Sequence, residues 1–86
     1  MGSRAEAARK HIVEFIRTNG PATVSAIAVR LRSEGVYEPG PRAFDEDRAS
    51  KHFARARVNE LYRKGVLVCR PHPTQRRTDL WRLSGT

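Results

Sequence analysis

The sequence predicts an α+β domain of three helices followed by a two-stranded antiparallel hairpin, and three observations carry that prediction. Apolar residues recur with helical spacing in three segments, which Gly and Pro separate. A β-branched run follows Gly65, and a second short apolar segment around Trp81 lies beyond a polar loop with two prolines. With 86 residues, the chain is expected to form a single domain over residues 1–86, with a core over about residues 5–83.

The first helix is expected over residues 4–18, where apolar side chains form one face and Ser3 is placed to cap the start. Asn19-Gly20-Pro21 ends this helix, because Gly readily adopts the left-handed conformation and Pro cannot continue the helical hydrogen bonds. A short extended link follows. Whether residues 22–24 of this link form a short third strand is left open.

The second helix is expected to begin after either Thr23 or Ser25, since both side chains suit a helix cap, and to end at Gly35. Its core-facing stripe consists of Val24, Ile27, Ala28 and Leu31. A long loop over residues 35–46 follows, in which Pro39-Gly40-Pro41 prevents a helix. This loop either packs Tyr37 and Phe44 onto the core or forms an extra contact surface.

The third helix is expected over residues 45–64, and its first turn carries the acidic triplet Asp45-Glu46-Asp47. An alternative is that Ser50 is the true cap and residues 45–49 form a separate turn. The core stripe of this helix consists of Ala54, Val58 and Leu61. The opposite side carries His52, Ala56, Asn59 and Arg63, with Arg48 and Arg55 flanking them. Such a side, with cations, an amide and a small central residue, suits insertion into a DNA major groove.

Two strands are expected at the end of the chain, over residues 65–70 and residues 79–83. The loop between them, residues 71–78, is the hairpin loop, because its two prolines and polar residues do not suit regular pairing. Trp81 and Leu83 alternate on one face of the second strand. This alternation predicts that both face the core rather than a bound base.

The positive charge is confined to one half of the chain. The net charge is +8, and residues 1–47 contain seven Lys or Arg and seven Asp or Glu, which cancel. Residues 48–86 contain ten Lys or Arg against only Glu60 and Asp79. An excess gathered in this way indicates a polyanionic partner rather than a generally cationic surface.

Several classes of function are not supported by the sequence. The single Cys69 excludes an intramolecular disulfide and a zinc site built on cysteines, and is expected to be a small buried residue in a strand. The histidines lie on three separate predicted elements, and neither a phosphate-binding loop nor a Ca²⁺-binding loop is present. We therefore expect no enzymatic activity, no metal, no cofactor and no small-molecule ligand. Without a long apolar run or a signal-peptide pattern, the protein is expected to avoid membranes and to be cytoplasmic, associated with the nucleoid.

The order of the predicted elements resembles the winged helix-turn-helix family of DNA-binding proteins, which includes many short bacterial and phage regulators. The resemblance covers about residues 5–83. In the first half it rests on Ile12-Val13-Glu14-Phe15-Ile16, Asn19-Gly20-Pro21-Ala22-Thr23, Ile27-Ala28 and Leu31. In the second half it rests on residues 58–67 (VNELYRKGVL) and on Leu80-Trp81-Arg82-Leu83. The long loop at residues 35–46 departs from the family pattern.

The resemblance implies that the third helix enters the major groove of double-stranded DNA and that the wing, residues 71–78, lies on the backbone or in the neighbouring minor groove. The DNA-binding residues expected on the third helix are Arg48, Lys51, His52, Arg55, Arg57 and Asn59. Those expected on the wing are Arg76, Arg77 and Thr78, with Gln75 as a further candidate. Arg55 and Asn59 suit base edges, whereas Lys51 and Arg57 suit phosphates.

Such a protein is expected to act as a transcriptional regulator or as an accessory factor in replication or recombination. The alternative is a winged-helix module for protein–protein contact, such as a phage factor that docks on a host complex. The acidic triplet and the loop at residues 36–47 are the features that favour this alternative. The sequence leaves open whether the protein is a monomer or a homodimer, and a single-stranded or RNA partner is a weaker third candidate.

Overall fold

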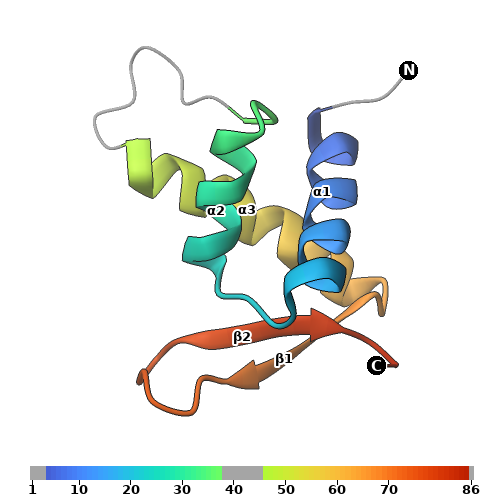
Figure 1. Ribbon diagram of the computed structural model, residues 1–86, viewed down its shortest axis with the longest axis vertical. Coiled ribbons are helices and arrows are strands. Elements are labelled where there is room, and N and C mark those ends of the chain that lie inside the picture. Colours follow the sequence, from blue (N-terminus) through green and yellow to red (C-terminus); the bar gives the residue numbers. More distant parts are fainter. Residues whose placement is uncertain (1–3, 38–45, 86) are drawn as a thin grey trace.

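The computed structural model describes residues 4–37 and residues 46–85, and it confirms the predicted α+β class (Figure 1). Three helices precede a two-stranded antiparallel sheet, an arrangement consistent with a winged helix. The elements are α1 (Arg4–Asn19), α2 (Val24–Ser33), α3 (Glu46–Arg63), β1 (Leu67–Pro71) and β2 (Asp79–Leu83). In Figure 1, α1 and α2 stand above the hairpin and α3 crosses behind them. The α2 helix begins close to β2, because Ala22 just before it forms a bridge with Trp81 of β2.

The ends of α2 follow directly from local sequence. The Thr23 hydroxyl accepts a hydrogen bond from the Ala26 N–H at 3.2 Å, so Thr23 rather than Ser25 caps the helix. At the other end, Gly35 has φ +69, and its N–H donates to the Arg32 carbonyl at 3.1 Å. The following Val36 N–H donates to the Leu31 carbonyl at 3.0 Å, which completes a Schellman turn.

The core lies where the three helices meet the inner face of the hairpin. The predicted stripe of α3 is confirmed, because Ala54, Val58 and Leu61 are no more than 5% exposed. The other buried apolar residues are Ala8, Ile12, Ile16, Ala22, Ile27, Ala28, Leu31, Leu67 and Trp81. Leu83 packs against this core from β2, as its alternation with Trp81 predicts. Cys69 lies in β1 as expected, but it is half-buried rather than buried.

The sheet differs from the prediction in the bounds of its first strand, and the possible third strand, which the sequence left open, is a single bridge. β1 begins at Leu67 rather than at residue 65, because Gly65 and Val66 complete the turn that ends α3. It extends to Pro71, which pairs with Asp79 at the last position of the register. The third strand at residues 22–24 is reduced to one bridge, in which Ala22 and Trp81 exchange backbone hydrogen bonds of 3.0 and 2.8 Å.

The structure tests two further predictions, on the start of α3 and on the packing of Tyr37. The helix runs without interruption from Glu46, and Ser50 is only 2% exposed within it, so the alternative with Ser50 as the cap is wrong. Tyr37 packs onto the fold as expected, since its ring stacks on that of Phe53 with centroids 4.3 Å apart. Phe44 and Asp45 lie outside the described residues, as do the side chains of Glu46 and Asp47. The proposed surface of the acidic triplet is therefore not described.

Candidate nucleic-acid interface

Two adjoining hollows bring α3, the start of α2 and the wing together. The first hollow has a volume of about 230 Å³ and is lined by Val24, Ser25, Arg48, Lys51, His52 and Arg55. The second has a volume of about 120 Å³ and is lined by Thr23, Val24, Ser25, Arg55, Arg77, Thr78, Asp79 and Trp81. Arg55, Val24 and Ser25 belong to both hollows, so the two form one surface. We call this surface the basic face.

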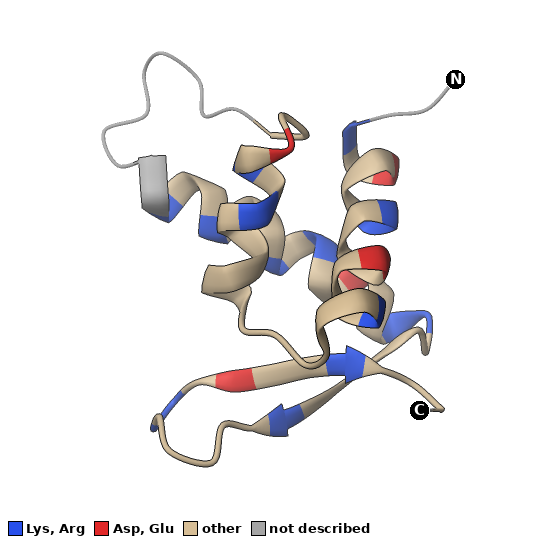
Figure 2. Ribbon diagram, in the orientation of Figure 1, with Lys and Arg blue, Asp and Glu red and all other residues tan. Residues whose placement is uncertain are grey.

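The basic face gathers most of the site residues that the sequence predicts. Figure 2 shows the cations of the first half of α3 and of the wing tip on the same side of the molecule. Arg48, Lys51, His52 and Arg55 come from α3, and Arg77 and Thr78 come from the wing. Arg76 is exposed beside Arg77 but lines neither hollow. Asn59 is exposed one helical turn beyond Arg55, and it also lies outside the hollows.

Some cations outside the basic face are neutralised by carboxylates. Elsewhere on the described chain, Arg17 pairs with Glu14 at 2.6 Å, and Arg30 pairs with Glu34 at 3.1 Å. In contrast, Lys51, Arg55 and Arg77 of the basic face, and Arg76 beside it, have no salt bridge among the described residues. Asp79 is the one carboxylate that lines these two hollows, as far as the described residues show. Unpaired guanidinium and ammonium groups keep their full attraction for phosphate.

Arg57 does not line the basic face, although the sequence predicts that it contacts phosphate. Its guanidinium donates two hydrogen bonds to Glu60, at 2.7 and 3.0 Å, and lies 4.9 Å from the centre of the Phe53 ring. Arg9 of α1 donates to the same carboxylate at 2.7 Å. Arg57 and Arg55 are two positions apart on a helix and so differ by about 200° in direction. Arg57 therefore lies on another side of the molecule, in an ion-pair cluster in which Arg9 and Glu60 join α1 to α3.

This ion pair makes part of the stability depend on pH. Hydrogen bonding to Arg57 holds the pKa of Glu60 below its ordinary value of 4.5, against the effect of burial, and Arg9 lowers it further. A pKa lowered by folding contributes stability that is fully present above about pH 4.5 and is lost as the pH falls through the folded value. Because the Glu60 side chain is 34% exposed, solvent screens these ion pairs.

We expect Glu60→Gln to lower the free energy of unfolding at neutral pH by about 1 kcal/mol or less, because the variant keeps hydrogen-bond acceptors but loses the charge. The variant should also lose less stability than the wild type when the pH falls below about 4.5. Urea denaturation at a series of pH values measures both quantities. Equal acid sensitivity of the two proteins would contradict a stabilising role for this carboxylate.

The start of α2 is a part of the basic face that the sequence analysis did not predict. Thr23, Val24 and Ser25 line the hollows because the bridge between Ala22 and Trp81 brings the α2 N-terminus beside the hairpin. The first N–H groups of a helix lack helical partners and favour anions. The capping pattern at Thr23 is visible in the sequence, but its proximity to Arg55 and Arg77 is a tertiary feature.

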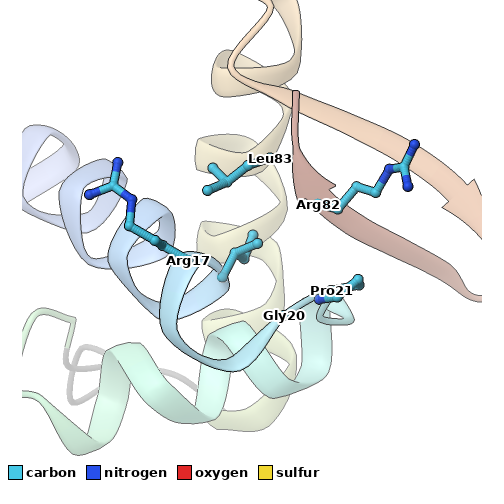
Figure 3. A pocket seen from close by; sticks show the side chains of 6 residues that line it. Arg17, Gly20, Pro21, Arg82 and Leu83 are labelled. Carbon is cyan, nitrogen blue, oxygen red and sulfur yellow. The ribbon is translucent and has the colours of Figure 1, made fainter. Parts of the chain in front are cut away.

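Other features of the surface point less clearly to a ligand. A hollow of about 340 Å³ lies at the end of α1, lined by Ile16, Arg17, Gly20, Pro21, Arg82 and Leu83 (Figure 3). Its two arginines extend from opposite sides, and Arg17 is already paired with Glu14. The described residues hold no group of three His, Cys, Asp or Glu side chains suited to a metal ion. Burial, and then the nearby Asp79, raise the pKa of the Cys69 thiol.

In the part of the chain that the structure describes, none of the helices is both long and apolar enough to cross a membrane. The chain matches no family model, no curated protein and no solved structure.

Proposed function

We propose that this protein binds double-stranded DNA through the basic face, with α3 in the major groove and the wing at residues 71–78 on the backbone or in the neighbouring minor groove. The observation that carries the proposal is that Lys51 and Arg55 of α3 and Arg77 of the wing, none of which has a salt bridge among the described residues, line one surface. These cations come from segments more than 20 residues apart, and the fold brings them together. The resemblance to winged helix-turn-helix proteins supports the same orientation.

The outward side of α3 suits the reading of bases. Its core stripe is buried, and the side opposite carries exposed His52 and Asn59 with the small Ala56 between them. A major groove about 12 Å wide admits one helix, and a small central residue allows close approach. Arg55 and Asn59 lie one turn apart, which suits bidentate contacts with guanine and adenine respectively.

The rest of the basic face suits the phosphate backbone. Lys51 and Arg77 are exposed and have no salt bridge among the described residues, and each lines one of the two hollows that the start of α2 also lines. The N–H groups at this helix end add a favourable partial positive charge. Contacts of this kind fix the position of α3 on the duplex without selecting a sequence.

As a cellular role, we propose transcriptional regulation or an accessory function in replication or recombination, at the nucleoid in the cytoplasm. A protein-docking module is the second candidate. Val29 of α2 favours it, because this apolar side chain is 63% exposed. The acidic triplet and the loop at residues 36–47 would belong to that docking surface, of which residues 38–45 lie outside the described chain.

A gel-shift titration with random duplex DNA tests the proposal directly. With about five phosphate contacts, the logarithm of the binding constant should fall with the logarithm of salt concentration at a slope of about −4 to −5. Retardation at low salt that disappears at high salt is the expected result. No retardation at any salt concentration would overturn DNA binding and favour the docking module.

Two alanine variants should separate the reading of bases from attraction to the backbone. Arg76→Ala should weaken binding to all duplexes alike and reduce the salt slope by about one unit, because it removes one phosphate contact. Asn59→Ala should instead flatten the preference among duplexes, by about 1–3 kcal/mol at one base pair. Selection of binding sites from random duplex DNA, followed by affinity measurements, checks both expectations. Equal weakening by both variants on every sequence would exclude a base-reading role for Asn59.

A further inference from the structure

The wing is folded around the imidazole ring of His72. The Nδ1 atom of this ring accepts hydrogen bonds from the backbone N–H groups of Thr74, at 3.1 Å, and Gln75, at 3.0 Å. The Thr74 hydroxyl lies 3.2 Å from the same atom. The backbone N–H of His72 donates to the backbone carbonyl of Thr78 at 2.8 Å, which closes the loop. The ring therefore acts as the acceptor at the centre of a tight turn, as an Asn or Asp side chain often does.

This arrangement is compatible with only one form of the ring. To accept from two N–H groups, Nδ1 has to carry a lone pair, so the single ring proton of neutral His72 has to be on Nε2. Protonation at Nδ1 would replace the acceptor by a donor that faces two other donors. The turn is thus favoured by the neutral imidazole and opposed by the imidazolium.

The same turn presents the cations of the wing. Arg77 follows two residues after Gln75 and has φ +62, a left-handed conformation that is uncommon for any residue except Gly. A strained residue of this kind persists only where the surrounding structure holds it. From this position Arg77 reaches the hollow that it shares with Arg55 of α3.

We propose that His72 is a positioning residue of the DNA interface: its neutral imidazole holds the turn that places Arg76 and Arg77 on the duplex. The inference rests on the proposed function, and it adds a residue that makes no DNA contact of its own. The same geometry implies that a proton on Nδ1 would remove the acceptor on which the turn is built.

Protonation of a histidine would affect DNA affinity in two opposite ways, and the experiment has to separate them. The charged groups around the wing are Arg70 of β1, Arg76 and Arg77 of the loop, Asp79 of β2 and Arg55 of α3. An imidazolium at His72 or His52 adds positive charge and attracts DNA, even while the turn loosens. Affinity is therefore best compared at about pH 8, where an ordinary histidine is neutral. The turn itself is best followed in the free protein.

The experiment compares the wild type with His72→Asn and His72→Ala, using His11→Asn of α1 as a control that removes an imidazole far from the wing. The Asn oxygen can occupy the position of Nδ1 and accept the same hydrogen bonds without titrating. At about pH 8, His72→Ala should bind duplex DNA about three- to tenfold more weakly than the wild type. His72→Asn and His11→Asn should remain within about twofold, because both keep an acceptor for the turn.

Nuclear magnetic resonance of the free protein provides the second readout. In the wild type, the neutral His72 ring should carry its proton on Nε2, and the amide signals of Thr74 and Gln75 should shift as the ring titrates. In His72→Asn these amide signals should not respond over the same pH range, whereas in His11→Asn they should respond as in the wild type.

The outcomes separate this inference from the proposed function. A neutral ring protonated on Nδ1 would overturn the turn-holding role. Amide signals of Thr74 and Gln75 that do not change with pH would overturn it as well. Wild-type affinity for His72→Ala at about pH 8 would overturn the positioning role, provided that the wild type binds DNA. If the wild type binds no duplex, the proposed function fails and the interface role fails with it. The resonance data would still decide whether His72 holds the wing.

Discussion

Replacing Arg55 by Glu should lower the affinity for duplex DNA by roughly 30- to 100-fold at moderate ionic strength. Arg55 is the cation that lines both hollows of the basic face, and it has no salt bridge among the described residues. The change removes a contact with a base or a phosphate, of about 1–3 kcal/mol, and adds a carboxylate that repels the backbone. Fluorescence anisotropy with a labelled duplex measures the loss directly.

Arg17→Glu provides a matched control, because it changes the net charge by the same amount at a site away from the basic face. Arg17 lines the hollow at the end of α1 and is paired with Glu14. Its replacement should reduce the affinity by no more than about threefold, through the general loss of positive charge. A similar loss for both variants would show that net charge alone drives binding and that the basic face has no special role.

Trp81→Ala should lower the free energy of unfolding by about 3–5 kcal/mol. Trp81 is only 8% exposed, and the ring of Tyr62 packs edge-on against it with centroids 5.8 Å apart. It also pairs with Ala22 through the backbone bridge that holds the start of α2 beside the hairpin. Small domains are often stable by only about 5 kcal/mol, so a large fraction of the variant should be unfolded at 37 °C. Urea denaturation followed by circular dichroism measures the change.

The same residue distinguishes a core role from stacking on a base. Trp81→Phe keeps most of the buried area, so it should cost less than about half as much stability and leave DNA affinity close to that of the wild type. If Trp81 stacked on a base instead, Trp81→Ala would weaken DNA binding while leaving stability nearly unchanged. That result would also contradict the assignment of Trp81 to the core.

The elements of the fold could be predicted because their signals are local. The apolar stripe of α3 is visible as Ala54, Val58 and Leu61, and all three are buried. Gly35 ends α2 where the sequence predicts, since a left-handed residue is needed there. The alternative in which Ser50 caps α3 was wrong, because Ser50 lies buried inside a helix that begins at Glu46, as the favoured prediction had it.

The candidate site could be predicted only in part, because salt bridges and proximity depend on the folded chain. Arg55 and Arg57 look alike in the sequence, yet Arg57 is held by Glu60 and Arg55 has no carboxylate partner in the described chain. The contribution of Thr23, Val24 and Ser25 to the basic face was not predictable either. It follows from a bridge between Ala22 and Trp81, which are far apart in the sequence.

By itself, the sequence determined where the helices and strands lie and which half of the chain is cationic, since these features depend on neighbours within one or two turns. Only the tertiary structure decided which cations are neutralised and which share a surface. Arg9 and Glu60 are 51 residues apart and form an ion pair at 2.7 Å, whereas Arg55 and Arg77 line one hollow and neither forms a salt bridge with a described carboxylate. The physical reason is that charges more than about 10 Å apart are largely screened by salt, and folding alone brings residues that are distant in the sequence within that distance.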